Sequence, residues 1–149
     1  MPNASIKKII SCKKHDLINM ILDIEKYPEF VPWCLNGKVH RKEDLKDMIE
    51  MEADLTVGKK FLNQTYKSHV TYYKNKDKII VSNIGGPLKH LSNEWLIKEV
   101  NNQCEVSFTI DFEIKNVFYN MIMKKSFDRG LLNIANAFEK RAINLFKNT

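Results

Sequence analysis

The sequence has 149 residues, a net charge of +6 at neutral pH, and 44% hydrophobic and 28% charged residues. These proportions exclude an intrinsically disordered chain and fit one globular domain over residues 1–149. No stretch approaches the roughly 18 apolar residues of a membrane span, and the N-terminal residues lack the apolar segment of a secretory signal. We therefore expect a soluble, cytoplasmic protein.

The cysteines and the lysines do not form a recognisable site. Cys12, Cys34 and Cys104 are odd in number and show no CxxC spacing, so we expect reduced thiols rather than disulfides or structural zinc. The lysines are scattered along the chain rather than gathered in one block. This distribution is typical of a solvated surface, and contact with RNA or an anionic membrane surface is the alternative.

The N-terminal part of the chain predicts a strand, a helix and a lid. Residues 3–11 carry the isoleucines of a first strand, and residues 14–24 repeat apolar residues at helical spacing. Residues 27–34, with the sequence YPEFVPWC, place four large apolar side chains beside two prolines, which prevent a long helix or a central strand. We expect this second, short helical piece to cover the core as a lid.

From Gly37 onward, apolar residues alternate with polar ones, which is the period of a half-buried strand. The alternation is clearest in residues 47–57, which Gly58 is expected to end, and in residues 104–115. Residues 61–73, 78–84 and 91–97 continue it. Short turn signals, such as Gly85-Gly86-Pro87 and Asn101-Asn102, separate these runs, so we expect six further strands in an antiparallel meander.

Residues 116–147 predict one long helix. Asn116 is a good N-cap, the run contains no proline, and apolar residues recur at steps of three and four. They are Phe127, Leu131, Ile134, Phe138, Ala142 and Leu145. An apolar helix stripe and an apolar sheet face bury one another. The predicted fold is α+β, with a curved seven-stranded antiparallel sheet wrapped around the long C-terminal helix and two short helices after the first strand.

The side chains predicted to face inward are mostly Phe, Tyr, Trp and Met, with Gln64, Ser68 and Asn93 among them. A sheet closed around a helix leaves a space that side chains fill incompletely. A lining of large flat side chains with a few polar groups suits an apolar ligand. A solid core whose polar groups are satisfied is the alternative.

Several segments together resemble one known family. They are YPEFVPWC at residues 27–34, YKSHV at 66–70, GPLKHL at 86–91 with Trp95, DFE at 111–113 and AFEKRA at 137–142. The chain resembles the coenzyme Q-binding, polyketide-cyclase-like branch of the START superfamily, which includes the bacterial RatA ribosome-association toxins and the mitochondrial ubiquinone-binding proteins. The family usually has an aromatic residue at the position of Leu88 and often an acidic one at that of Gly85.

The resemblance implies a helix-grip fold of the START or birch-pollen-allergen type, a deep hydrophobic cavity and no catalytic residues. It implies no required cofactor, and ubiquinone or a similar isoprenoid lipid as the ligand. The predicted ligand contacts are Tyr27, Phe30, Trp33, Tyr66, Ser68, Val70, Trp95, Phe108, Phe112, Phe127, Leu131 and Phe138. The first three of these would form a movable lid.

Asp111 and Glu113 are the one conspicuous pair of carboxylates in the sequence. Strand alternation puts both on the face opposite Phe108, so we expect ion pairs with Arg141 or a nearby lysine rather than acid–base catalysis. The four histidines show no metal-ligand spacing. Gly130, inside the long helix, is expected to let a strand approach the helix closely, and a bend of the helix around the ligand is the alternative.

Three functions fit these observations. The first is a non-enzymatic lipid carrier that supports quinone function in respiratory electron transport, in the cytoplasm or peripheral to the inner membrane. The second is a ribosome-association toxin that binds the large ribosomal subunit and blocks subunit joining. The third, a polyketide-cyclase-type enzyme, would need an inward acid–base pair that the alternation does not offer. DNA is not an expected partner.

Overall fold

The computed structural model describes residues 3–59, 62–85 and 88–146, with their side chains except at positions 3, 4, 59, 62, 63, 85, 88, 112, 114, 119, 120 and 122–129. The elements follow in the predicted order of strand, two short helices, six strands and long helix. They are β1 (Asn3–Ile10), α1 (Lys14–Leu22), η1 (Ile24–Glu29), β2 (Cys34–Asp44), β3 (Met48–Lys59), β4 (Leu62–Tyr73), β5 (Lys78–Gly85), β6 (Leu88–Val100), β7 (Gln103–Ile114) and α2 (Val117–Phe146).

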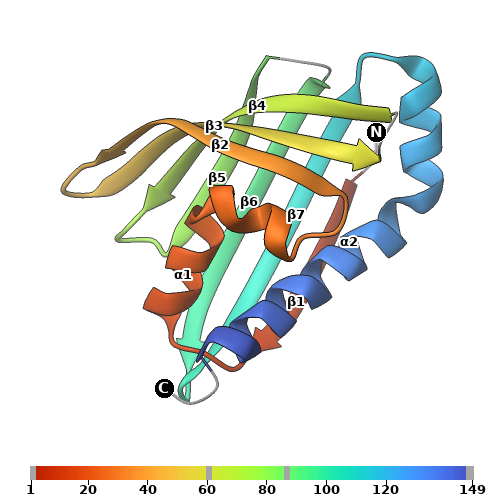
Figure 1. The fold of residues 1–149 in the computed structure, drawn as a ribbon. Coiled ribbons are helices and arrows are strands. Elements are labelled where there is room, and N and C mark those ends of the chain that lie inside the picture. The colour runs from red at the N-terminus through yellow and green to blue at the C-terminus, as the bar shows by residue number, and fades with distance from the viewer. Residues whose placement is uncertain (1–2, 60–61, 86–87, 147–149) are drawn as a thin grey trace.

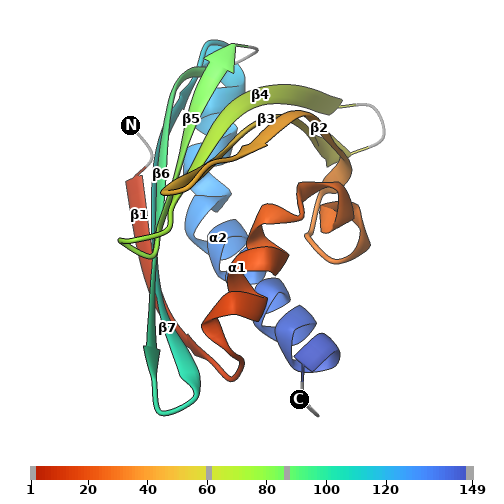
Figure 2. The same cartoon turned by 90° about the vertical axis from the view of Figure 1, so that its left-hand side faces the viewer.

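The seven strands form one antiparallel sheet in the order β1-β7-β6-β5-β4-β3-β2. From β2 to β7 each strand pairs with the next one along the chain, while β1 joins the far edge beside β7. The sheet is strongly bent, and α2 runs along its length (Figure 1). A side view places α1, η1 and α2 on the concave side (Figure 2). The predicted fold class is therefore confirmed.

The asparagines predicted to cap the long helix and to form the turn before the last strand take these roles in the structure. Asn116 Oδ1 accepts a hydrogen bond of 3.0 Å from the backbone N–H of Phe118, which caps the start of α2. Asn101 and Asn102 have φ values of 52° and 65°, the left-handed conformation that a tight hairpin turn between β6 and β7 requires.

Two expectations about local structure are wrong. Gly58 does not end its strand, because β3 continues through it to Lys59 with a φ of 138° at the glycine. The backbone N–H of Gly58 donates to the carbonyl of Trp33 at 2.8 Å, a contact that ties the strand to the lid segment. Leu145, expected on the buried stripe of α2, is 48% exposed, while its neighbour Phe146 is partly buried against the core.

The hydrophobic core lies between the concave face of the sheet and the three helices. Leu17, Ile18 and Ile21 of α1 recur at helical spacing and are buried, and Asp16 in the first turn suits the positive end of the helix dipole. Burying one such side chain contributes about 1.5–3 kcal/mol relative to leaving it exposed. Among the described residues, no helix is both long enough and apolar enough to cross a bilayer.

Candidate ligand-binding site

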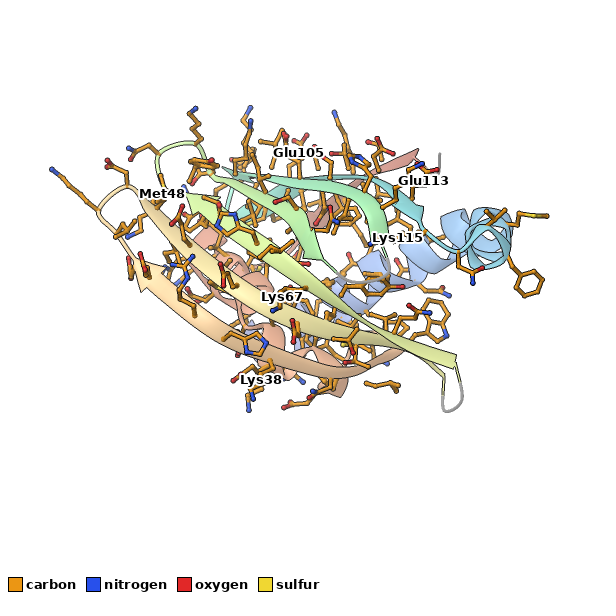
Figure 3. All side chains as sticks on the ribbon, turned by 90° about the horizontal axis from the view of Figure 1, so that it is seen from above. Lys38, Met48, Lys67, Glu105, Glu113 and Lys115 are labelled. Atoms are coloured by element: carbon orange, nitrogen blue, oxygen red, sulfur yellow. The ribbon has the colours of Figure 1, made fainter. Side chains whose placement is uncertain are left out.

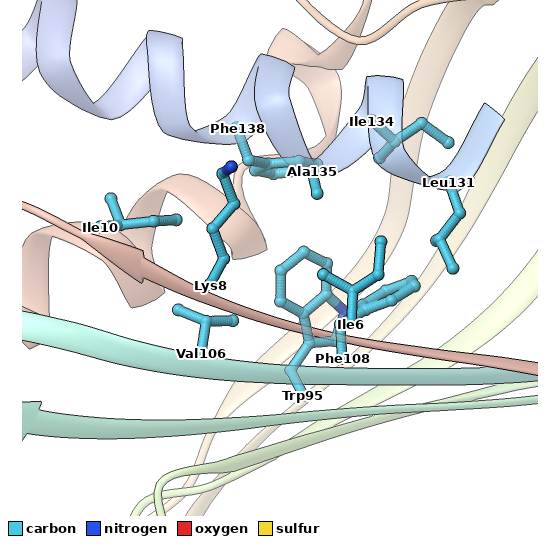
Figure 4. Close-up of a pocket in the computed structure, with 10 residues that line it drawn as sticks. All are labelled: Ile6, Lys8, Ile10, Trp95, Val106, Phe108, Leu131, Ile134, Ala135 and Phe138. Atoms are coloured by element: carbon cyan, nitrogen blue, oxygen red, sulfur yellow. The ribbon is translucent and has the colours of Figure 1, made fainter. Parts of the chain in front are cut away.

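A cavity of about 30 Å³ lies between α2 and the end of the sheet formed by β1, β7 and β6 (Figure 4). Its lining is apolar except for one lysine. The lining residues are Ile6, Lys8, Ile10, Trp95, Val106, Phe108, Leu131, Ile134, Ala135 and Phe138. The space between sheet and helix predicted from the sequence therefore exists, and Trp95, Phe108, Leu131 and Phe138 meet around it.

The described cavity is too small for a lipid. Its volume of about 30 Å³ is far below the roughly 300–1,000 Å³ of ligand pockets. The deep hydrophobic cavity implied by the family resemblance stays a prediction, because the side chains at position 112 of β7 and at positions 122–129 of α2 lie outside the described residues.

A cluster of aromatic rings occupies the space beside this cavity, with Phe138 of α2 at its centre. The Phe138 ring lies edge-on to Trp95 at 5.2 Å between centroids, to Phe30 at 5.1 Å and to Tyr27 at 5.5 Å. Trp95 also meets Phe108 at 4.7 Å. Edge-to-face pairs at these distances are favourable beyond their burial of area. One side chain thus joins the sheet, the long helix and the lid.

The buried polar side chain beside this cluster has a hydrogen bond at each of its two polar atoms. Asn93 of β6 is 8% exposed, and its amide nitrogen donates to the backbone carbonyl of Thr109 at 2.8 Å. Its amide oxygen accepts from Trp95 Nε1 at 3.1 Å. Asn93 was predicted to face inward, and its role here is to satisfy the indole N–H and fix the orientation of the Trp95 ring.

The predicted lid residues cover the cluster from the side of η1. The Tyr27 hydroxyl donates to the backbone carbonyl of Ile21, and burial raises the pKa of Tyr27. Trp33 is 41% exposed, and its ring lies against Gly130 of α2, where an added Cβ would be 3.5 Å from the ring. The described residues therefore do not show the close approach of a strand expected at Gly130: its neighbour is the lid, at an ordinary van der Waals distance.

An ion pair fastens the lid to α2. Arg141 donates to Glu29 Oε1 at 2.9 Å, and its guanidinium lies 5.0 Å from the centroid of the Phe30 ring. The hydrogen bond from Arg141 lowers the pKa of the Glu29 carboxyl. Because Glu29 is well exposed, this pair positions the lid and contributes little to stability.

The remaining predicted ligand contacts do not line this cavity. Val70 of β4 is buried. Tyr66 and Ser68 precede it at every second position, so all three share the concave face of β4, towards the other edge of the sheet. Burial raises the pKa of Tyr66. The side chains of Phe112 and Phe127 lie outside the described residues, so these two ligand contacts remain predictions.

Sequence reasoning missed the cavity residues contributed by the edge strand. Ile6, Lys8 and Ile10 alternate along β1 and all line the cavity, whereas Ile9 is 60% exposed. The period of two was present in the sequence, but a lysine at its middle position concealed it. Val106, Ile134 and Ala135, which also line the cavity, belong to patterns that were recognised as a strand and a helix.

The carboxylate pair faces away from the cavity, as predicted. Asp111 lies 3.6 Å from His90, and Glu113 lies 3.9 Å from Lys89 of the neighbouring strand β6. The alternative partner proposed for them, Arg141, pairs with Glu29 instead, because α2 covers the opposite face of the sheet. This geometry gives the two carboxylates no access to a molecule held on the concave side.

The three cysteine thiols are buried and show no sign of being reactive. Burial raises the pKa of Cys12 to about 12 and that of Cys34 to about 11, so both are protonated at neutral pH. Cys104 is buried next to Cys12, and its thiol donates to the Cys12 carbonyl at 3.3 Å. In the part of the chain that the structure describes, no cluster of His, Cys, Asp or Glu side chains could hold a metal ion.

A second hollow, of about 210 Å³, lies between α1, η1 and the C-terminal turns of α2. Its wall includes both acidic and basic side chains, among them Asp16, Asp23, Lys26 and Arg141. Charged groups of both signs make this hollow a poor place for an apolar chain, because their hydration would be lost.

The outer, convex face of the sheet carries charges of alternating sign. Lys38 of β2 pairs in register with Asp54 of β3, which in turn pairs with Lys67 of β4. Figure 3 shows the side chains of the sheet from above, with Lys38 and Lys67 labelled. Asp54 also lies 2.7 Å from His40. This part of the surface is therefore close to neutral rather than uniformly basic.

Comparison with known proteins identifies the relatives of this chain. The sequence profile of the family described as polyketide cyclase / dehydrase and lipid transport matches residues 14–139. The mitochondrial coenzyme Q-binding protein COQ10 of Dictyostelium discoideum is 32% identical over 135 residues, which are 89% of this chain and 64% of that protein. The chain thus spans somewhat less than two thirds of this relative. The ribosome association toxin RatA of Rickettsia prowazekii is 27% identical over 143 residues, 94% of this chain and 95% of the toxin.

Solved structures share the fold. An 18 kDa protein from Caulobacter crescentus is 26% identical and superposes with a TM-score of 0.79 over 97% of this chain and 98% of its own. A START superfamily protein from Mycobacterium smegmatis gives a TM-score of 0.79 at 17% identity, over 96% of this chain and 98% of its own. At that identity the second likeness concerns the fold alone.

Proposed function

Because this chain belongs to the polyketide cyclase / dehydrase and lipid transport family, we propose that it binds an isoprenoid quinone between the concave sheet face and α2. Ubiquinone or a related lipid is the ligand, and no bond is made or broken. The likeness to a coenzyme Q-binding protein supports the choice of a quinone. In this proposal the protein supports respiratory electron transport by holding the quinone away from water.

The lining of the described cavity is the observation that carries this proposal. Nine of the ten lining residues are apolar, and they come from the sheet and from the long helix alike. Transfer of a polyprenyl chain from water into such surroundings is favourable by about 25 cal/mol per Å² of apolar surface. Such a chain can therefore bind without specific polar contacts along its length.

A lipid requires more room than the cavity offers, so the lid has to move. Tyr27 and Phe30 reach over Phe138 from η1, outside the pairing of the sheet. Trp33 has a φ of 62°, an unusual conformation for a bulky residue, and is 41% exposed. Withdrawal of Tyr27 and Phe30 frees the Phe138 ring, which is part of the cavity wall, to move and enlarge the space, at less cost than separation of paired strands.

Lipid extraction is the direct test of this proposal. We expect an organic extract of gently purified protein to contain a quinone or another isoprenoid lipid in about equimolar amount by mass spectrometry. An extract from the same preparation after heat denaturation and washing serves as the blank. Native protein that carries no lipid and takes up none from ubiquinone-containing vesicles would contradict the proposal.

The two tryptophans provide a second readout of the same event. Trp95 lies in the cavity wall, whereas Trp33 lies in the lid. In Trp33→Phe, Trp95 is the remaining indole, and a bound quinone ring is expected to quench its fluorescence by accepting an electron. The quenching should saturate, whereas collisional quenching by free quinone would rise linearly with concentration.

The non-enzymatic part of the proposal rests on what faces the cavity. Asn93 is the buried polar side chain beside it, and both of its polar atoms are hydrogen-bonded. Asp111 and Glu113 lie on the other face of the sheet. A cyclase-type reaction needs a positioned acid and base next to its substrate, and the described concave face offers no such pair.

Binding to the large ribosomal subunit is the second candidate function, because the chain resembles a ribosome association toxin over nearly its full length. Contacts to RNA phosphates weaken steeply with salt, by orders of magnitude between about 50 and 200 mM. If the quinone proposal holds alone, we expect the protein to remain in the supernatant when large subunits are sedimented at both salt concentrations. Co-sedimentation that is lost at the higher salt would favour the ribosome instead.

A further inference from the structure

Lys8 is the one charged residue in the lining of the described cavity. It stands between Ile6 and Ile10 on the inner side of β1, so its aliphatic stem adds to the apolar wall (Figure 4). Lys7, the preceding residue, is exposed on the outer side. A lysine in this setting keeps its stem in apolar surroundings and its ammonium group at the water boundary. That boundary is also where the head group of a bound amphiphile would lie.

The ammonium group bridges the edge of the sheet to the long helix. Lys8 Nζ donates to Asn136 Oδ1 at 2.9 Å and lies 3.1 Å from Glu139 Oε1. The Lys8 and Glu139 side chains are 24% and 34% exposed. An ammonium group has three N–H donors, and these two described partners account for at most two of them. At least one donor therefore remains for an acceptor held at the mouth of the cavity.

The charge balance at this mouth selects the chemistry of that acceptor. Glu139 offsets the charge of Lys8, so an anionic head group would meet a neutral pair and would itself have to lose hydration. A carbonyl oxygen accepts the remaining N–H without that penalty, and a charged donor makes its hydrogen bond stronger than a neutral one.

We propose that Lys8 binds the head group of the ligand where β1 meets α2. Its ammonium group donates to a neutral carbonyl acceptor, such as a quinone oxygen, in preference to an anion. This inference rests on the proposed function and assigns the polar recognition within it. The apolar chain lies between sheet and helix, and the carbonyl lies beside Lys8 and Asn136.

Calorimetric titration with three probes tests the proposal, namely geranylbenzoquinone, geranylbenzene and geranyl phosphate. For the wild-type protein we expect the quinone to bind tightest. Lys8→Met keeps the length of the stem and removes the donor, so it should weaken quinone binding by roughly tenfold or more and leave geranylbenzene unchanged. Lys7→Met, which removes an outward lysine from the same strand, should alter neither affinity. The unfolding temperature of each variant verifies that it is folded.

Glu139→Gln supplies a second variant that retains an acceptor for Lys8. Loss of the counter-charge should tighten the binding of geranyl phosphate severalfold while the quinone affinity changes little. The inference is overturned if Lys8→Met leaves quinone affinity unchanged, if it weakens quinone and hydrocarbon equally, or if the wild-type protein prefers the phosphate. Failure of the wild-type protein to bind any of the three probes would overturn the proposed function as well.

Discussion

Phe138→Ala is expected to lower the free energy of unfolding by about 3–5 kcal/mol, the range for removal of a large buried aromatic ring. Phe138 is 3% exposed and touches Trp95, Phe30 and Tyr27 edge-on. These neighbours come from the sheet and from the lid segment, so they cannot collapse together into the space that the ring leaves. Equilibrium unfolding in urea measures the loss as a lower midpoint.

Leu132→Ala is the matched control for Phe138→Ala. Leu132 stands on the same helix but is 49% exposed, so its truncation should change stability by no more than about 0.5 kcal/mol. If Phe138→Ala were equally mild, the aromatic cluster would not be the joint between lid, sheet and helix. In the surviving folded fraction of the variant, added ubiquinone should raise the unfolding temperature more than in the wild-type protein, because the enlarged cavity gives a ligand more room.

Gly37→Ala is expected to cost about 1–3 kcal/mol or more, the range for an overpacked interior. A Cβ at position 37 of β2 would lie 2.3 Å from the backbone carbonyl oxygen of Ile24 in η1. Neither atom can rotate away, because the backbone fixes the position of the Cβ and the oxygen belongs to the main chain, so strand and helix have to separate. The measurement is the unfolding temperature, together with the loss of protection of the η1 amides from hydrogen exchange.

Gly130→Ala is the comparison variant, because its expected change in stability has the opposite sign to that of Gly37→Ala. A Cβ there would meet the Trp33 ring at 3.5 Å, an ordinary van der Waals distance. Alanine is the better residue in a helix interior by roughly 0.5–1 kcal/mol, so this variant should be neutral or more stable. Equal losses in the two variants would mean that α2 and the lid approach each other more tightly than the structure shows.

The architecture could be predicted from the sequence because each element carries its own periodic signal. The alternation in β3, β4 and β7 and the three–four spacing in α2 depend on neighbours along the chain, and so do the asparagines at the β6–β7 turn. The error at Gly58 has a different origin. A glycine usually interrupts a strand, but here a hydrogen bond to Trp33, distant in sequence, stabilises its unusual φ.

The candidate site was harder to predict, because its dimensions depend on how side chains from distant segments share one space. Trp95, Phe108 and Phe138 could be assigned to inward faces, and they do meet around the cavity. Their edge-to-face packing leaves only about 30 Å³, and no single strand or helix determines that number. Lys8 escaped notice because a charged residue in an alternating strand is normally assigned to the solvent side.

The position of β1 has a consequence for the order in which the molecule is assembled. β1 pairs with β7, from which it is separated along the chain by two short helices and five strands, whereas the hairpins from β2 to β6 join adjacent segments. Such local hairpins close early, and a contact between distant segments closes late. During synthesis β1 therefore remains unpaired until β7 has been made. The compartment with walls from β1 and α2 closes only after β7 and α2 have both been made, so a guest cannot be enclosed before then.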